Sequence, residues 1–97
     1  MSSERQIHVP ASFLALYTPT GQIRPTLPRQ WLEDRHDLCE DLSQLLAEKV
    51  KDKVWQLGIT IADAMGRIEQ GLPDLNLEMN DAERDWVMCR VAEILED

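Results

Sequence analysis

The sequence predicts an all-α protein: a small bundle of about four helices around one long central helix. Three observations lead to this fold class. Apolar residues recur at spacings of three and four over residues 28–58, a stretch with no glycine before position 58. Two capping sequences for helix N-termini follow, one from Thr60 to Asp63 and one from Asn80 to Glu83. Glycines stand where two of the helical patterns end, at Gly58 and at position 71.

The central helix is expected to cover residues 28–58, with Thr26 or Leu27 as its cap and Pro28 in its first turn. Acidic residues crowd its first half and lysines its second, an arrangement that interacts favourably with the helix dipole. Its apolar stripe is expected to contain Leu38/Cys39, Leu42, Leu45/Leu46, Val50, Val54 and Leu57. A helix of some thirty residues spans roughly 45 Å, so it should either support the smaller elements or extend into a partner.

The remaining elements are shorter. Residues 1–7 are expected to form a flexible N-terminal tail, followed by a short helix that begins near Pro10 and lies on the central helix. A turn at 18–21 and an extended segment at 23–27 lead into the central helix. After it, a helix ending at Gly71 contains Gly66, which suggests a close approach to another helix. A last helix should run nearly to the C-terminus, and residues 1–97 are expected to be a single domain.

Composition excludes several functions. The 97 residues include 18 acidic and 10 basic side chains, which gives a formal net charge of −8. Nucleic-acid binding and docking on anionic membranes both need a positive surface, so neither is expected. A basic protein partner remains compatible with this charge. No secretory leader and no apolar run long enough for a membrane span is recognised, so the protein is expected to be soluble and cytoplasmic.

The sequence offers no catalytic motif. The four glycines are isolated and none opens a phosphate-binding loop with a lysine. Glu33 and His36 have the Glu-x-x-His spacing of di-iron sites, but a second copy and further glutamates are missing, so a solvated helix turn is the simpler interpretation. We therefore expect no enzyme, no cofactor and no metal.

A metal- or redox-responsive protein is the alternative hypothesis. His36 and Cys39 are three residues apart on the central helix, and Cys89 could reach them from the last helix. Both cysteines also fit core positions, where they would be free buried thiols. The acidic neighbours Glu40 and Asp41 would disfavour a thiolate at Cys39.

Surface recognition is the function that remains. Tryptophan is enriched at the energetic centres of interfaces, and core packing is the competing role for Trp31 and Trp55. The acidic side chains of the central helix could meet a basic partner, although such a row is commonly only solvated. The candidate partner-binding residues are Trp31, Glu33, Asp37, Glu40, Asp41 and Trp55. The sequence thus predicts a non-enzymatic protein–protein interaction or accessory (chaperone-like adaptor) module, expected to be a homodimer.

Four segments carry a resemblance to known proteins. They are Pro-Ala-Ser-Phe-Leu-Ala-Leu-Tyr at 10–17, Arg-His-Asp-Leu-Cys-Glu-Asp-Leu at 35–42, Leu-Gly-Ile-Thr at 57–60 and Trp-Val-Met-Cys-Arg-Val-Ala-Glu-Ile-Leu at 86–95. Together they resemble a group of small, uncharacterised proteobacterial proteins of about this length, some labelled as an ATPase with chaperone activity. The resemblance covers nearly the whole chain and implies a bacterial cytoplasmic protein with an all-helical domain. It implies no site residues, and the chain supplies no phosphate loop for the ATPase part of that label.

Overall fold

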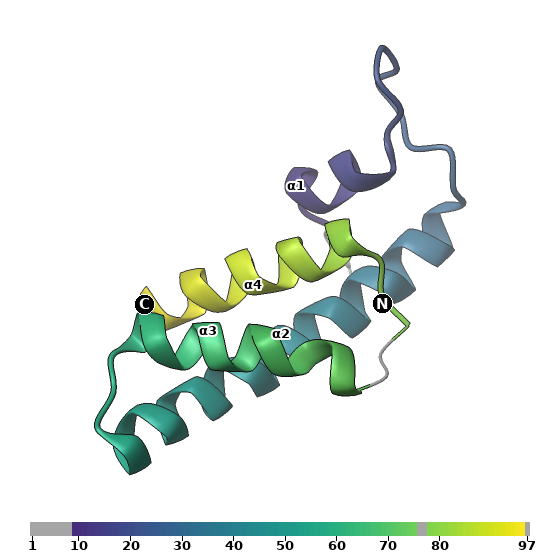
Figure 1. Ribbon diagram of the computed structural model, residues 1–97. Helices are drawn as coiled ribbons and strands as arrows, with labels where there is room; N and C mark the ends of the chain where they lie inside the picture. The colour runs from purple at the N-terminus through teal and green to yellow at the C-terminus, as the bar shows by residue number, and fades with distance from the viewer. Residues whose placement is uncertain (1–8, 76–77, 97) are drawn as a thin grey trace, which may run out of the picture. The chain divides into compact units, whose positions relative to one another are not determined.

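The computed structural model describes residues 9–75 and 78–96, and every regular element within them is helical (Figure 1). The order of elements is α1 (Ala11–Leu14), the 3₁₀ helix η1 (Ala15–Tyr17), α2 (Arg29–Leu57), α3 (Ile61–Gly71), the 3₁₀ helix η2 (Leu72–Leu75) and α4 (Asp81–Glu96). This confirms the predicted all-α fold with one long helix. The predicted N-terminal tail lies outside the described residues.

The chain divides into two compact units, Met1–Cys39 and Glu40–Asp97, and their boundary falls inside α2. In the first unit, aromatic side chains hold α1 and η1 against the beginning of α2. The ring of Phe13, which is fully buried, lies edge-on to that of His36 at 5.4 Å between centroids. Tyr17 meets Trp31 in the same manner at 5.1 Å. Such edge-to-face pairs are favoured by the ring quadrupoles, and they confirm that the short first helix lies on α2.

The connection between η1 and α2 is closed by backbone hydrogen bonds. Gln22 N–H donates to the carbonyl of Pro19 at 3.0 Å, which forms a turn with Gly21 at φ 87°. Thr26 N–H then donates to the carbonyl of Tyr17 at 3.3 Å and ties the end of the loop to the end of η1. The predicted turn at 18–21 is therefore present, one residue later than expected.

Helix α2 begins at Arg29, so the expected caps Thr26 and Leu27 are wrong. The carbonyl of Pro28 accepts the first helical hydrogen bond, from Leu32 N–H at 3.1 Å, which makes Pro28 itself the cap. At the other end Gly58 has φ 65° and its N–H donates to the carbonyl of Val54. The predicted left-handed stop at Gly58 is thereby confirmed.

The predicted apolar stripe of α2 is only partly correct. Cys39, Leu46 and Val50 are buried, whereas Leu38, Leu45 and Leu57 each expose about half of their surface. Successive helical residues point about 100° apart, so only one member of the pairs 38/39 and 45/46 can face the core. The buried side also contains two polar residues that a hydrophobic pattern omits, His36 and Ser43.

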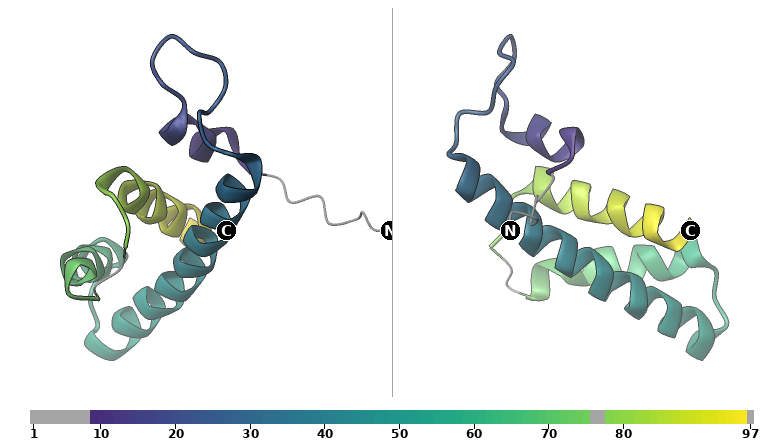
Figure 2. Two further views of the ribbon diagram at one scale, coloured as in Figure 1. Left: turned by 90° about the vertical axis from the view of Figure 1, so that its right-hand side faces the viewer. Right: turned by 180° about the vertical axis from the view of Figure 1, so that it is seen from behind.

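In the second unit, the later part of α2 and the helices α3 and α4 run in alternating directions (Figures 1 and 2). Short connections favour such antiparallel neighbours. Their buried side chains form the core of this unit: Ser43, Leu46, Ala47 and Val50 from α2, Ala64 from α3, Leu72 from η2, and Glu83, Val87, Met88 and Val91 from α4.

Both predicted capping sequences are confirmed. Thr60 Oγ1 accepts a hydrogen bond from Asp63 N–H at 3.1 Å at the start of α3. Before α4, Asn80 Oδ1 accepts from Glu83 N–H at 2.7 Å, and Glu83 Oε1 accepts from Asn80 N–H at 3.3 Å. This reciprocal pair is a capping box that satisfies two helix-end donors, and it explains how the carboxylate of Glu83 is accommodated at 2% exposure.

Of the two expectations for glycines in α3, the helix end at Gly71 is confirmed and the close approach at Gly66 is wrong. Among the residues that the structure describes, none outside the backbone of α3 itself would lie within 4 Å of a Cβ built on Gly66, so no other helix there approaches it closely. Helix α3 ends at Gly71 as expected, and the chain continues directly into η2 because Leu72 keeps right-handed helical angles (φ −59°, ψ −42°). Gly66 therefore lowers helix propensity without any packing gain.

Candidate interaction surface

One side of the later part of α2 is open to solvent and carries acidic residues and a tryptophan. Asp41, Glu48 and Trp55 are seven residues apart, so they lie nearly in line on the helix surface. Asp52, three residues before Trp55, joins the same side. All four are exposed. We call this set, Asp41, Glu48, Asp52 and Trp55, the Trp55 face.

Trp55 is the most unusual member of this face, because 88% of its surface is exposed. Its helical neighbours Lys51 and Asp52 are also exposed and charged, so no apolar side chain of α2 shields the ring. Burying a large apolar side chain contributes about 3 kcal/mol. In the isolated chain Trp55 does not contribute this stabilisation, because its side chain is exposed.

The end of α2 exposes further apolar surface. Leu57, the last residue of α2, is 53% exposed, and Ile61, the first residue of α3, is 48% exposed. Together with Trp55 they give this end of the second unit three large apolar side chains within seven positions. The sequence hypothesis that the far end of the long helix is left uncovered thus agrees with the exposure of these residues.

Glu40, one of the predicted partner-binding residues, is occupied within the second unit. Its carboxylate oxygens accept hydrogen bonds from Nε and Nη2 of Arg90 on α4, at 2.8 and 3.0 Å. This bidentate geometry is the strong form of an ion pair. The hydrogen bonds that Arg90 donates to Glu40 are the main cause that raises the pKa of Arg90 above its ordinary value, with Glu93 adding to the effect. Glu40 therefore joins α2 to α4.

Glu33, a second predicted residue, has a partner one helical turn away. Its Oε2 lies 2.8 Å from Nε of Arg29, and its side chain is only 15% exposed. Asp37 is more accessible, with 53% of its side chain exposed and Oδ1 4.0 Å from Nδ1 of His36. Both belong to the first unit, whereas Asp41 and Trp55 belong to the second.

Trp31 is partly covered. One edge contact is made with Tyr17, and the guanidinium carbon of Arg35 lies 5.9 Å from the ring centroid, within the range of a cation–π interaction. The residue is 39% exposed. Of the two candidate tryptophans on α2, Trp31 thus contributes to local packing while Trp55 does not.

The residues of the alternative hypothesis are placed as follows. Cys39 is fully buried and His36 nearly so, whereas Cys89 is exposed, so the expected burial of both thiols is wrong for Cys89. Neither cysteine is in a disulfide bond. Among the residues that the structure describes, no three His, Cys, Asp or Glu side chains are grouped as metal ligands would be.

Sequence reasoning missed Glu48 and Asp52 as members of the exposed acidic side. The spacing of seven from Asp41 through Glu48 to Trp55 could have identified it. The acids were instead grouped by their position in the first half of the helix, which combined residues that point in different directions.

The chain matches no protein-family model, no curated protein and no solved structure. Within residues 9–75 and 78–96, none of the helices has the length and apolar character that crossing a bilayer requires.

Proposed function

We propose that this protein is a non-enzymatic interaction module that binds a basic protein partner through the Trp55 face. The observation that carries the proposal is the 88% exposure of Trp55 on a side of α2 that also presents the carboxylates of Asp41, Glu48 and Asp52. Tryptophan is enriched among the residues that dominate the binding energy of interfaces, and charges around it guide encounter and register.

Charge supports the choice of a basic partner. The chain has a formal net charge of −8, and Asp41, Glu48 and Asp52 lie along one side of the helix. Lys51 has Nζ 3.4 Å from a carboxylate oxygen of Glu48 and compensates one of these three carboxylates. A partner with lysines or arginines around an apolar slot could bury the Trp55 ring and pair with the carboxylates beside it.

The proposed setting is the bacterial cytoplasm, and the proposed role is accessory, of the adaptor or chaperone-like kind. Two free thiols, one of them exposed, suit a reducing compartment. An adaptor needs only a rigid surface, and a helix with its inner side packed supplies one.

We also propose that the protein acts as a homodimer. Leu45 is 53% exposed and Leu42 is half-buried three residues earlier, which leaves apolar surface on α2 beside the Trp55 face. A second copy could cover it. Because each copy carries −8, repulsion should weaken the dimer at low salt, and the dimer fraction should rise as salt screens the charges.

The experiment that tests the binding proposal is quantitative affinity capture from a bacterial extract with three baits: the wild type, Trp55→Ala and Ile23→Ala. Ile23 is 93% exposed in the loop before α2 and provides a matched loss of exposed apolar surface. The proposal expects a basic protein that is retained by the wild type and by Ile23→Ala, and is retained about tenfold less by Trp55→Ala, a loss of about 1.4 kcal/mol.

A second variant tests the acidic part of the face. Replacing Asp41, Glu48 and Asp52 by their amides should lower retention of the same protein and flatten its salt dependence. Identical capture profiles for Trp55→Ala and Ile23→Ala, or a captured protein that is indifferent to the amide substitutions, would contradict the proposal.

A further inference from the structure

A pocket in the first unit is separate from the Trp55 face. It is a half-open hollow of about 560 Å³, a size in the usual range for small-molecule sites. Its apolar lining comes from three segments: Val9 and Leu14 around α1, Pro25 and Leu27 in the loop before α2, and Leu32 in the first turns of α2. Leu32 is 4% exposed and packs into the unit beneath the pocket.

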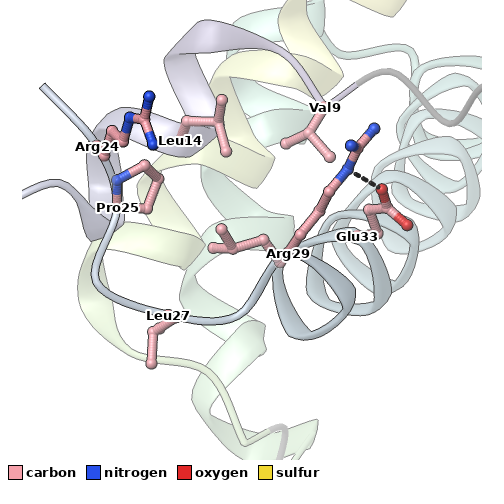
Figure 3. A pocket seen from close by; sticks show the side chains of 8 residues that line it. Val9, Leu14, Arg24, Pro25, Leu27, Arg29 and Glu33 are labelled. Carbon is pink, nitrogen blue, oxygen red and sulfur yellow. Dashed lines mark hydrogen bonds and ion pairs between the residues drawn. The ribbon is translucent and has the colours of Figure 1, made fainter.

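Three charged side chains complete the lining: Arg24, Arg29 and Glu33. Figure 3 shows Arg24 beside Pro25 on one side and Arg29 with Glu33 on the other, with Leu14 and Val9 between them. Nε of Arg29 and Oε2 of Glu33 are 2.8 Å apart, so these two charges compensate each other.

Arg24 is different. Among residues 9–75 and 78–96, no carboxylate lies within ion-pair distance of its guanidinium. The pocket therefore keeps one uncompensated positive charge in a protein whose formal net charge is −8. A guanidinium presents paired N–H donors that match the two oxygens of a carboxylate. An apolar cavity with a single cation at its edge is complementary to an apolar molecule with a single negative charge.

We propose that this pocket binds a small monoanionic amphiphile, an aliphatic carboxylate of fatty-acid type. Arg24 receives the carboxylate, and the chain lies against Leu14, Leu27 and Leu32. The pair formed by Arg29 and Glu33 closes the opposite side without adding charge. This assignment does not depend on the proposed protein partner, because every lining residue belongs to the first unit.

The test is isothermal titration of the full chain with decanoate, kept below the concentration at which it forms micelles. Saturable binding of one decanoate per chain is expected. Arg24→Gln should raise the dissociation constant at least tenfold, because it removes the charge and leaves the apolar lining intact. Arg24 is exposed, so this variant should fold, which circular dichroism checks. Arg67→Gln removes an exposed arginine of α3 in the second unit and should leave the affinity unchanged.

Three further ligands distinguish the contribution of the carboxylate from that of the aliphatic tail. Decylammonium and 1-decanol have the same chain with the opposite charge or none, and each should bind at least tenfold more weakly than decanoate. A short apolar peptide with a free C-terminal carboxylate offers the same head group from another source. The assignment is overturned if decanoate shows no saturable binding, if Arg24→Gln or decylammonium retains the affinity, or if the peptide binds tenfold more tightly than decanoate.

Discussion

The inner and outer sides of the later part of α2 carry residues of unexpected kinds. On the inner side Ser43 is fully buried beside Leu46 and Val50. On the outer side Trp55, the largest side chain of the segment, is 88% exposed. The helix thus separates two tasks: the inner side stabilises the fold, and the outer side is free to bind. Residue type alone would assign both Ser43 and Trp55 to the wrong side.

The largest expected effect is on the inner side. Leu46→Ala should lower the free energy of unfolding by about 3 kcal/mol, because Leu46 is 1% exposed and its removal leaves a cavity. Urea unfolding followed by circular dichroism measures the change. The neighbouring Leu45→Ala is the control, with an expected loss below about 1 kcal/mol since half of Leu45 is already exposed. Equal losses would show that the two sides are not distinct.

A smaller effect on the free energy of unfolding is expected at Glu40, whose carboxylate joins α2 to α4. Glu40→Gln should cost about 1 kcal/mol, because Arg90 loses its bidentate partner. Glu48→Gln, eight residues later, removes a carboxylate that is paired with the exposed Lys51 at 3.4 Å, and should cost less than about 0.5 kcal/mol.

The sign of the pH dependence follows from Arg90. Its pKa is raised in the folded state, so its contribution is complete below the unfolded pKa and is lost only as the pH rises through the folded one. The difference between wild type and Glu40→Gln should therefore be the same at about pH 7 and about pH 9. A cost that shrinks over this interval would contradict the role given to Arg90.

Away from α2, Gly66→Ala should stabilise the protein by up to about 1 kcal/mol. The substitution improves helix propensity, and the added Cβ meets no atom within 4 Å. A rise in the thermal midpoint would support this. A destabilisation would mean that another surface does approach Gly66, as the sequence first suggested.

The smallest effect on stability is expected at the centre of the outer side. Trp55→Ala should change the free energy of unfolding by less than about 0.5 kcal/mol, because so little of the side chain is buried. Chemical denaturation of this variant beside Leu46→Ala sharpens the contrast between the two sides. A loss above about 2 kcal/mol would show that the Trp55 side chain is buried in the folded protein.

Much of the fold follows from the sequence, because local signals determine it. The stop at Gly58 and the caps at Thr60 and Asn80 depend on side chains and backbone within a few residues. The identity of the buried side does not, since it depends on which neighbour packs against α2, and periodicity could not choose between Leu45 and Leu46. Tertiary pairs such as Glu40 with Arg90, fifty residues apart, leave no local pattern.

The candidate site shows the same limit. Trp55 was identified from residue type and from its position near the end of the long helix. Glu33 and Glu40 were grouped with it as acids, yet each has an ion-pair partner within the chain. The pocket lined by Arg24 and Leu27 draws on a loop without periodicity, so no sequence pattern predicted it.

The most direct test of the central claim is the fluorescence of Trp55 alone, in a Trp31→Phe, Trp86→Phe variant shown to be folded by circular dichroism. The exposure of Trp55 predicts an emission maximum close to that of free tryptophan in water and quenching by acrylamide nearly as efficient as for the free amino acid. A blue-shifted emission with weak quenching in the folded monomer would contradict the account, because Trp55 would then belong to the inner side.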